Sequence, residues 1–376
     1  VGNHTDRVFH VGPIASAQLA MSNLTIQNGR PADLFGSGGG VSVGSGSSLD
    51  LSGARLTANT ADNSFGAGIV NIGSINVVDT LIDQNSFGVL GSGAGIYTAG
   101  SATLSNVTVS SNSGANSGGG VYNTGVLTLM NSTISGNTTA VRGGSSPGSG
   151  AGVWNSGTVT MAGVTISNNQ AAANSVTCGG AAGGGLATTG GALTITNSTI
   201  TGNMALGAAS CGPGPGNGSG GGVWAVSGTT TITNSTLTNN SAQNGPTTSG
   251  AGGNVYVVNP ASLTLRNSIV ANSPVGGNCS GAPQSTGSNL SSDATCNLTA
   301  AGDLNNTNPL IGPLQENGGP TQTQALLAGS PAIDAVLPGN CPPPTTDQRG
   351  LVRPAGPRCD IGAFEVGAVA PTPTVS

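Results

Sequence analysis

A short motif that recurs along this chain restricts it to very few folds. Residues 127–137, LTLMNSTISGN, return with few changes as residues 193–203 and 230–240. Weaker copies fill the intervals, and successive copies start 25 to 37 residues apart. Self-similarity at such a period is typical of solenoids, in which each repeat packs only against its neighbours. The units are aligned by Asn23, Gly53, Asp79, Asn106, Asn131, Gly163, Asn197, Asn234 and Asn267.

Apolar residues occupy fixed columns within these units. One column lies two residues before the aligning position, another lies three residues after it, and a third follows a Gly-[Gly/Ala]-Gly signal. The intervening Thr, Ser and Asn give the period of two that is typical of strands with one buried face, and they fill positions that a helix would need. We therefore predict an all-β fold: a single-stranded right-handed parallel β-helix of about nine turns, with three strands per turn.

The period fails after Ser273, where Pro becomes more frequent. This change divides the chain into an N-terminal cap or strand at 1–18, the β-helix at 19–273, a C-terminal capping module at 274–366 and a Pro/Thr tail at 367–376. We expect the capping module to close the open end of the coil.

Asparagine returns at the end of the second strand of each unit. Because Asn tolerates the left-handed backbone conformation, we expect it to form the corner there, and stacked copies could bond one another through their amides. The Asn residues of this column are Asn59, Asn85, Asn112, Asn137, Asn169, Asn203 and Asn240, with Asn28 and Asn272 one position early.

Charged residues are scarce, and this scarcity limits the possible functions. The chain has a net charge of -5, its eight basic residues are all Arg, and the only charged residue between Asp83 and Arg266 is Arg142. Nucleic-acid binding needs clustered basic residues, so we predict none. Glycan lyases and hydrolases need acidic groups on one outer face, and the coil offers only the acids of its early turns. We predict no catalytic site, no metal site and no cofactor.

The acids of the early turns are Asp50, Asp79 and Asp83. The column register places Arg55 and Asp83 on neighbouring strands, two positions out of register, where a diagonal pair can form. A surface ion pair is the simpler interpretation, and a calcium or catalytic cluster is the alternative.

The position after the third apolar column holds every Trp and Tyr of the chain. Its aromatic members are Tyr97, Tyr122, Trp154, Trp224 and Tyr256. Since the neighbouring aliphatic residues face inward, alternation predicts that these rings face outward. They could stack on one another and shield the sheet, contact another protein, or bind a glycan.

Six Cys without a Cys-x-x-Cys pair indicate disulfides and an oxidising, extracellular setting. Cys178 and Cys211 lie in equivalent loops of successive turns, so we predict that they form a bridge. The remaining pairs would then be Cys279–Cys296 and Cys341–Cys359. No apolar run approaches the ~18 residues of a membrane helix, so no membrane span is expected.

The C-terminal module carries the charge that the coil lacks. Its motifs include DQRGLVRP at 347–354 and CDIGAFE at 359–365. The succession resembles the C-terminal part of bacterial secreted β-helix proteins of the choice-of-anchor type, and that resemblance implies an exported cell-surface protein without a catalytic residue set. We expect Arg–carboxylate pairs within this charge cluster. The cluster consists of Asp347, Arg349, Arg353, Arg358, Asp360 and Glu365.

Three functions fit these patterns. We favour a non-enzymatic extracellular structural protein that binds copies of itself, through its solenoid ends or its aromatic face, to form a fibre or sheath. An adhesin that binds a cell-surface glycan is the alternative, and a polysaccharide lyase or hydrolase is the third.

Overall fold

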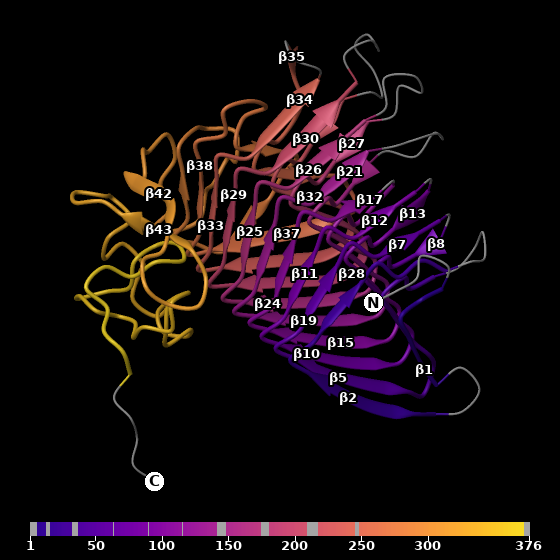
Figure 1. Cartoon of the computed structure of the whole chain (residues 1–376). Coiled ribbons are helices and arrows are strands. Elements are labelled where there is room, and N and C mark those ends of the chain that lie inside the picture. Colours follow the sequence, from indigo (N-terminus) through magenta and orange to yellow (C-terminus); the bar gives the residue numbers. More distant parts are fainter. Residues whose placement is uncertain are drawn as a thin grey trace.

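The computed structural model describes residues 6–12, 16–31, 37–62, 64–88, 90–114, 116–140, 148–173, 180–208, 217–244 and 248–371. These residues form strands and loops and contain no helix, so none of the described segments is a helix that could cross a membrane. The strands wind into a parallel β-helix, as predicted (Figure 1).

Three parallel sheets run along the coil. Sheet A, with 18 strands, contains five-residue strands that carry the first apolar column and shorter strands that carry the third. The first set is β2 (Gln18–Ser22), β5 (Ser48–Ser52), β10 (Ser74–Val78), β15 (Ser101–Ser105), β19 (Val126–Met130), β24 (Thr158–Ala162), β37 (Ser262–Arg266) and the two-residue β40 (Gln284–Ser285). The second is β1 (Phe9–Val11), β4 (Val41–Val43), β9 (Ile69–Asn71), β14 (Ile96–Thr98), β18 (Val121–Asn123), β23 (Val153–Asn155), β36 (Val255–Val257) and β39 (Cys279–Ser280). In β28 (Leu186–Thr196) and β32 (Val223–Thr233) the two kinds of strand are continuous.

Sheet B carries the second apolar column on ten strands. They are β3 (Thr25–Gln27), β6 (Arg55–Thr57), β11 (Leu81–Asp83), β16 (Thr108–Ser110), β20 (Thr133–Ser135), β25 (Thr165–Ser167), β29 (Thr199–Thr201), β33 (Thr236–Thr238), β38 (Ile269–Ala271) and β41 (Leu290–Ser291).

Sheet C follows the second corner and was not predicted from the sequence. Its eight strands are β7 (Thr60–Ala61), β12 (Ser86–Phe87), β17 (Ser113–Gly114), β21 (Thr138–Ala140), β26 (Gln170–Ala172), β30 (Met204–Gly207), β34 (Ser241–Asn244) and the antiparallel β35 (Thr248–Ser249). Smaller sheets pair β8 (Ser64–Phe65) with β13 (Gly91–Ser92), and β27 (Ala181–Ala182) with β22 (Gly148–Ser149) and β31 (Gly218–Ser219).

The predicted apolar columns form the core. Leu104, for example, pairs in register with Val77 and Leu129 of the neighbouring turns, and all three are fully buried. Val109 does the same between Ile82 and Ile134 in sheet B. Each turn therefore stacks apolar side chains on those of the next, which buries a continuous core along the axis.

The corner prediction was half right. The Asn column forms an amide ladder: Asn112 Nδ2 donates to Asn137 Oδ1 at 3.0 Å and to the Ile82 carbonyl at 2.9 Å. The left-handed residue is the one before the ladder position, such as Gln84 (φ 56°) or Ser111 (φ 54°); of the predicted corner residues, Asn28 (φ 59°) and Asn272 (φ 55°) adopt this conformation. The ladder asparagines are buried because their amides bond along the coil, while the preceding residue makes the turn.

One predicted domain boundary was wrong. The segment predicted as an N-terminal cap or strand contains β1, which pairs in parallel with β4 of the coil. At the other end, β39, β40 and β41 pair with β36, β37 and β38 and form a tenth turn within the predicted capping module. Cys279, Cys296 and Leu298 are buried in the main core at this end.

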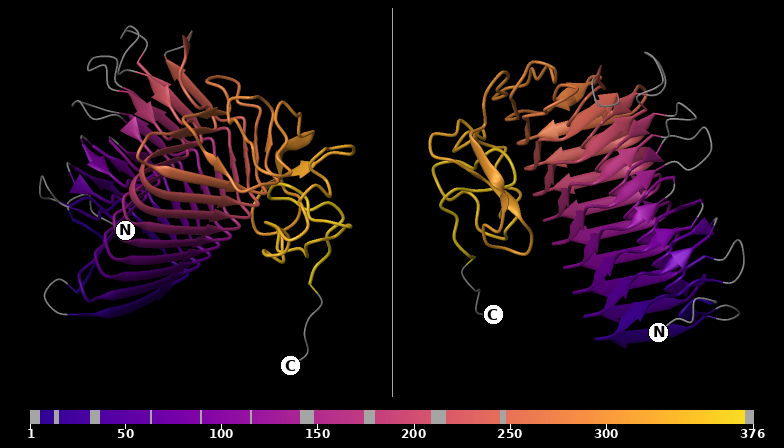
Figure 2. Two further views of the ribbon diagram at one scale, coloured as in Figure 1. Left: turned by 180° about the vertical axis from the view of Figure 1, so that it is seen from behind. Right: turned by 45° about the horizontal axis from the view of Figure 1, so that its top comes forward.

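The rest of the C-terminal module does not cap the coil. After the tenth turn the chain forms the antiparallel hairpin β42 (Ile311–Gln315) and β43 (Thr323–Leu326) and lies against the outer face of sheet B (Figures 1 and 2). Ile269, Ala271 and Leu290 of the last strands pack with Leu326, Val336 and Ile361 in a second core. Burial of these apolar residues on the outside of sheet B therefore holds the module against the coil.

Candidate functional site

The aromatic column forms a stacked ladder over three successive turns. Tyr97 and Tyr122 stack with ring centroids 5.6 Å apart, and Tyr122 stacks on Trp154 at 4.0 Å with an interplanar angle of 9°. Phe65 of β8 contacts Tyr97 at 4.4 Å and extends the ladder sideways. Burial and the nearby Tyr97 raise the pKa of the Tyr122 hydroxyl. The rings therefore pack mainly on one another, which was one of the expected arrangements.

Ala187 interrupts this column. It lies in register between Trp154 and Trp224, and Trp224 pairs with Tyr256 on the next turn. All five predicted aromatic residues are half-buried, whereas Phe65, which the sequence did not single out, is 43% exposed. The ladder of Phe65, Tyr97, Tyr122 and Trp154 is called the aromatic ridge below.

Of the three acids predicted in the early turns, Asp83 forms an ion pair, whereas Asp50 and Asp79 accept hydrogen bonds from Asn76 and Asn106 at 3.2 Å. Arg55 donates to Asp83 from Nη2 at 2.7 Å and from Nε at 3.1 Å, which confirms the predicted diagonal pair. Arg30 and Asp62 form a similar pair at 2.7 Å. No cluster of three or more potential metal ligands occurs among the described residues.

The charge cluster of the C-terminal module is internal. Arg353, 2% exposed, bonds Glu365 Oε2 at 2.8 Å and the carbonyls of Asp360 and Gly362, while Glu365 also accepts two backbone N–H groups. Burial lowers the pKa of the Arg353 guanidinium, and neighbouring carboxylates oppose that shift. The predicted Arg–carboxylate pairing is thus present, but it fixes loops of the module to one another rather than closing the coil.

A second pair of this cluster joins Arg349 to Asp347 at 2.7 Å. The Arg349 guanidinium also lies 3.6 Å from the ring centre of Phe364 and donates to the Glu365 carbonyl. Cation–π contact and hydrogen bonding thereby order the end of the CDIGAFE motif.

The other two members of the charge cluster, Asp360 and Arg358, differ in their burial. Asp360 is buried and accepts the N–H groups of Asp334 and Val366 at 2.7 and 2.6 Å. Burial raises the pKa of this carboxyl to about 6, against the effect of those hydrogen bonds. Arg358 is exposed, and its side chain forms no ion pair with the described residues.

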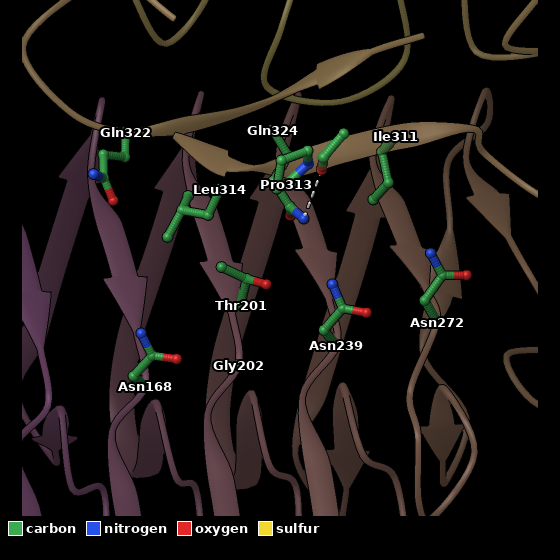
Figure 3. A pocket seen from close by; sticks show the side chains of 11 residues that line it. Asn168, Thr201, Gly202, Asn239, Asn272, Ile311, Pro313, Leu314, Gln322 and Gln324 are labelled. Carbon is green, nitrogen blue, oxygen red and sulfur yellow. Dashed lines mark hydrogen bonds between the residues drawn. The ribbon is translucent and has the colours of Figure 1, made fainter. Parts of the chain in front are cut away.

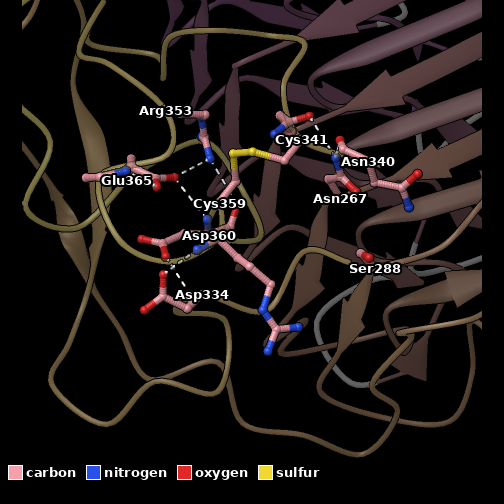
Figure 4. The surroundings of a disulfide bond; sticks show 12 residues. Asn267, Ser288, Asp334, Asn340, Cys341, Arg353, Cys359, Asp360 and Glu365 are labelled. Carbon is pink, nitrogen blue, oxygen red and sulfur yellow. Dashed lines mark hydrogen bonds and ion pairs between the residues drawn. A yellow bond between two sulfur atoms is a disulfide. The ribbon is translucent and has the colours of Figure 1, made fainter. Parts of the chain in front are cut away.

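Two predicted disulfides are confirmed. Cys279–Cys296 closes the tenth turn, and Cys341–Cys359 joins two loops of the module next to Asp360 (Figure 4). Asn267 of the last full turn donates to the Asn340 carbonyl at 2.9 Å, which ties this second disulfide to the coil. Both bridges indicate an oxidising compartment. The predicted Cys178–Cys211 bridge lies outside the described residues.

A groove of about 610 Å³ lies between sheet B and the β42–β43 hairpin (Figure 3). Its floor consists of corner residues from successive turns, and the hairpin supplies the opposite wall. The lining residues are Asn168, Thr201, Gly202, Asn239, Asn272, Ile311, Gly312, Pro313, Leu314, Gln322 and Gln324. None of them is charged, so this groove offers amides, a hydroxyl and aliphatic groups but no carboxylate or basic side chain.

The residues that dock the module on sheet B were missed in the sequence. Gln348, buried at the interface, accepts from Thr199 Oγ1 at 2.6 Å and donates to Thr165 Oγ1 at 2.9 Å and Thr321 Oγ1 at 3.0 Å. Ala363 N donates to Thr236 Oγ1 at 3.0 Å. Gln348 belongs to the DQRGLVRP motif, but the motif does not indicate that two of its partners, Thr199 and Thr165, lie 149 and 183 residues away.

Comparisons with known proteins add little. No family model matches the chain, and no curated protein matches its sequence. A solved structure described as "Crystal structure of pectate lyase Pel9A" aligns with a TM-score of 0.42 and 14% identity, over 96% of this chain and 86% of that chain. A likeness at this level carries no conclusion about activity.

Proposed function

We propose that this protein is a non-enzymatic structural protein of the cell surface: a rigid extracellular rod that associates with copies of itself along its aromatic ridge. The observation that carries the proposal is the use of its polar groups. The buried asparagines bond along the coil, and the buried carboxylates of the module bond arginines and backbone N–H groups of the module itself.

Polar groups that bond one another in this way favour a rigid rod rather than a catalytic site. An amide ladder inside the coil must break if two turns separate, because buried amides cannot be left without partners. The module adds a second restraint, since it bonds sheet B at several turns between Gly163 and Asn267. A rod held in this way is suited to a mechanical role on a surface.

The ridge is the face that we propose for self-association. Phe65 is 43% exposed and the ridge tyrosines are half-buried, so a second rod could cover their edges. End-to-end assembly has less support, because the tenth turn and its disulfide cover the core at the C-terminal end of the coil. A glycan adhesin also has less support, because ring faces that stack on one another are not free to stack on sugars.

Sedimentation velocity over a wide concentration range tests this proposal. We expect species larger than one chain for the native protein, and their loss in Phe65→Asp, which places a carboxylate on the ridge. Leu327→Asp is the matched control, because Leu327 is similarly exposed, at 49%, but belongs to the module.

A native protein that sediments as a single chain at every concentration would contradict self-association, as would equal effects of the two variants. Release of oligosaccharides from any polysaccharide incubated with the native protein would contradict the non-enzymatic role.

A further inference from the structure

The outer face of the five-residue strands of sheet A carries a column of threonines. Six successive turns place Thr at the central outward position, and each of these residues pairs in register with the next. The column consists of Thr103, Thr128, Thr160, Thr194, Thr231 and Thr264, and all six are exposed or half-buried. These residues and their outward neighbours are called the threonine face.

The neighbouring outward positions are mostly small and almost uncharged, with Val126 and Met130 as exposed apolar exceptions. On one side of the column lie Ser101, Val126, Thr158, Ala192, Thr229 and Ser262. On the other side lie Ser105, Met130, Ala162, Thr196, Thr233 and Arg266. Arg266, at the margin, is the only charged residue among them. A partner of this face must therefore be neutral, because a charged one would lose its hydration without gaining a counter-charge.

The hydroxyl groups of the column have no partner among the residues that the structure describes. Within the described chain, none of the six side chains forms a hydrogen bond, whereas Thr165, Thr199 and Thr236 of sheet B all bond the C-terminal module. Thr165, Thr199 and Thr236 thus have partners in the module, whereas the six threonines of this column have none among the described residues.

The backbone fixes these hydroxyls on a regular grid. Neighbouring strands lie ~4.8 Å apart, and alternate residues of one strand lie ~6.6 Å apart on the same face. Thr is branched at Cβ and has few side-chain rotamers, so methyl and hydroxyl groups repeat with the backbone. The central column therefore repeats one hydroxyl and one methyl group at the strand spacing, and seven of the twelve flanking positions add a further hydroxyl.

We propose that the threonine face binds the surface of ice. Ice presents an uncharged lattice of hydrogen-bonding oxygens with a repeat close to the ~4.8 Å strand spacing of the column. Each hydroxyl can anchor one water molecule and each methyl can order the water beside it, so that bound water continues the lattice. Because the grid is preformed, little conformational entropy is lost on binding.

Other occupants fit this face less well. A crystalline polysaccharide would be expected to stack its sugar rings on aromatic side chains, and none belongs to the threonine face. A second copy of the chain would have to bury six unpartnered hydroxyls on each side, which is unfavourable unless every one finds a partner.

Ice growth in the presence of the intact protein tests this proposal. We expect faceted crystals, a gap between the melting and freezing temperatures, and inhibition of recrystallisation. Thr160→Arg places a long charged side chain in the middle of the grid, and we expect it to abolish the temperature gap. Thr133→Arg is the matched control on the uncovered part of sheet B, where the residue is outward-facing and half-buried, and should leave the gap unchanged.

Circular dichroism and melting temperature identify any variant that is misfolded, and Thr194→Tyr then replaces Thr160→Arg. Normal ice growth with the native protein overturns the proposal. Retention on crystalline cellulose or chitin without any effect on ice overturns it in favour of a glycan, and loss of self-association in Thr160→Arg overturns it in favour of a contact between copies. Because Phe65→Asp leaves the threonine face intact, ice binding and the proposed self-association can fail separately.

Discussion

Sheets A and B of the same coil both carry outward threonines, but the surroundings of these threonines differ. Sheet B presents Thr165, Thr199 and Thr236 on successive turns, and the C-terminal module covers and bonds them. Sheet A presents the threonine face, which no described residue covers with a hydrogen bond. Thr199 and Thr194 lie only five residues apart in the chain, yet the first is fully buried and the second is exposed.

The two sheets differ in the residues that lie next to their outward threonines. Sheet B ends in Ile269 and Ala271, outward residues that form a second core with the module. Burial of this apolar surface stabilises docking, at roughly 25 cal/mol per Å². Gln348 then supplies the partners that the buried hydroxyls require. Sheet A has no comparable apolar end among its described strands, so the outward threonines of its five-residue strands remain available to solvent.

The largest effect is expected from the ion pair that holds the module together. Arg353→Met would leave the carboxylate of Glu365 buried without its counter-charge, and we expect a loss of about 3–5 kcal/mol of stability. Docking on sheet B depends on these loops, so the module should undock first. Urea unfolding followed by circular dichroism measures the loss.

Arg358→Met is the control for this change. Arg358 is exposed and carries no described ion pair, so its replacement should change stability by less than about 0.5 kcal/mol. Similar losses in the two variants would contradict the structural role assigned to Arg353.

The coil could be predicted because apolar residues recur at the same positions of every turn, which identifies the buried face of each strand. The apolar columns and the diagonal pair of Arg55 and Asp83 follow from that regularity. The two disulfides of the C-terminal region were predicted instead as the pairs that remained once Cys178 was assigned to Cys211. The position of the C-terminal module does not. Gln348 meets Thr199 across 149 residues of sequence, and one irregular segment gives no periodic signal for such a contact. The cluster of Arg and carboxylate residues predicted pairing correctly but could not indicate which part of the coil it would cover.

A smaller effect is expected from the protonation of Asp360. Its pKa is raised to about 6 in the folded protein, against about 3.9 in an unfolded chain. The folded state therefore holds the proton more tightly, and the contribution of this group to stability should be greatest below about pH 4 and decline until about pH 6. A carboxyl-carbon NMR titration should show a midpoint near 6 for Asp360. A midpoint near 4 would mean that burial does not govern this carboxyl.

The difference between Thr199→Val and Thr194→Val tests the central claim most directly, because the two substitutions are isosteric and lie on the two faces. Thr199→Val should lower the free energy of unfolding by about 1–3 kcal/mol, since it leaves the buried Gln348 oxygen without its donor. Thr194→Val should change it by less than about 0.5 kcal/mol. Equal changes in the two variants, or a larger loss at Thr194, would contradict a coil whose sheet B is covered and whose sheet A is free.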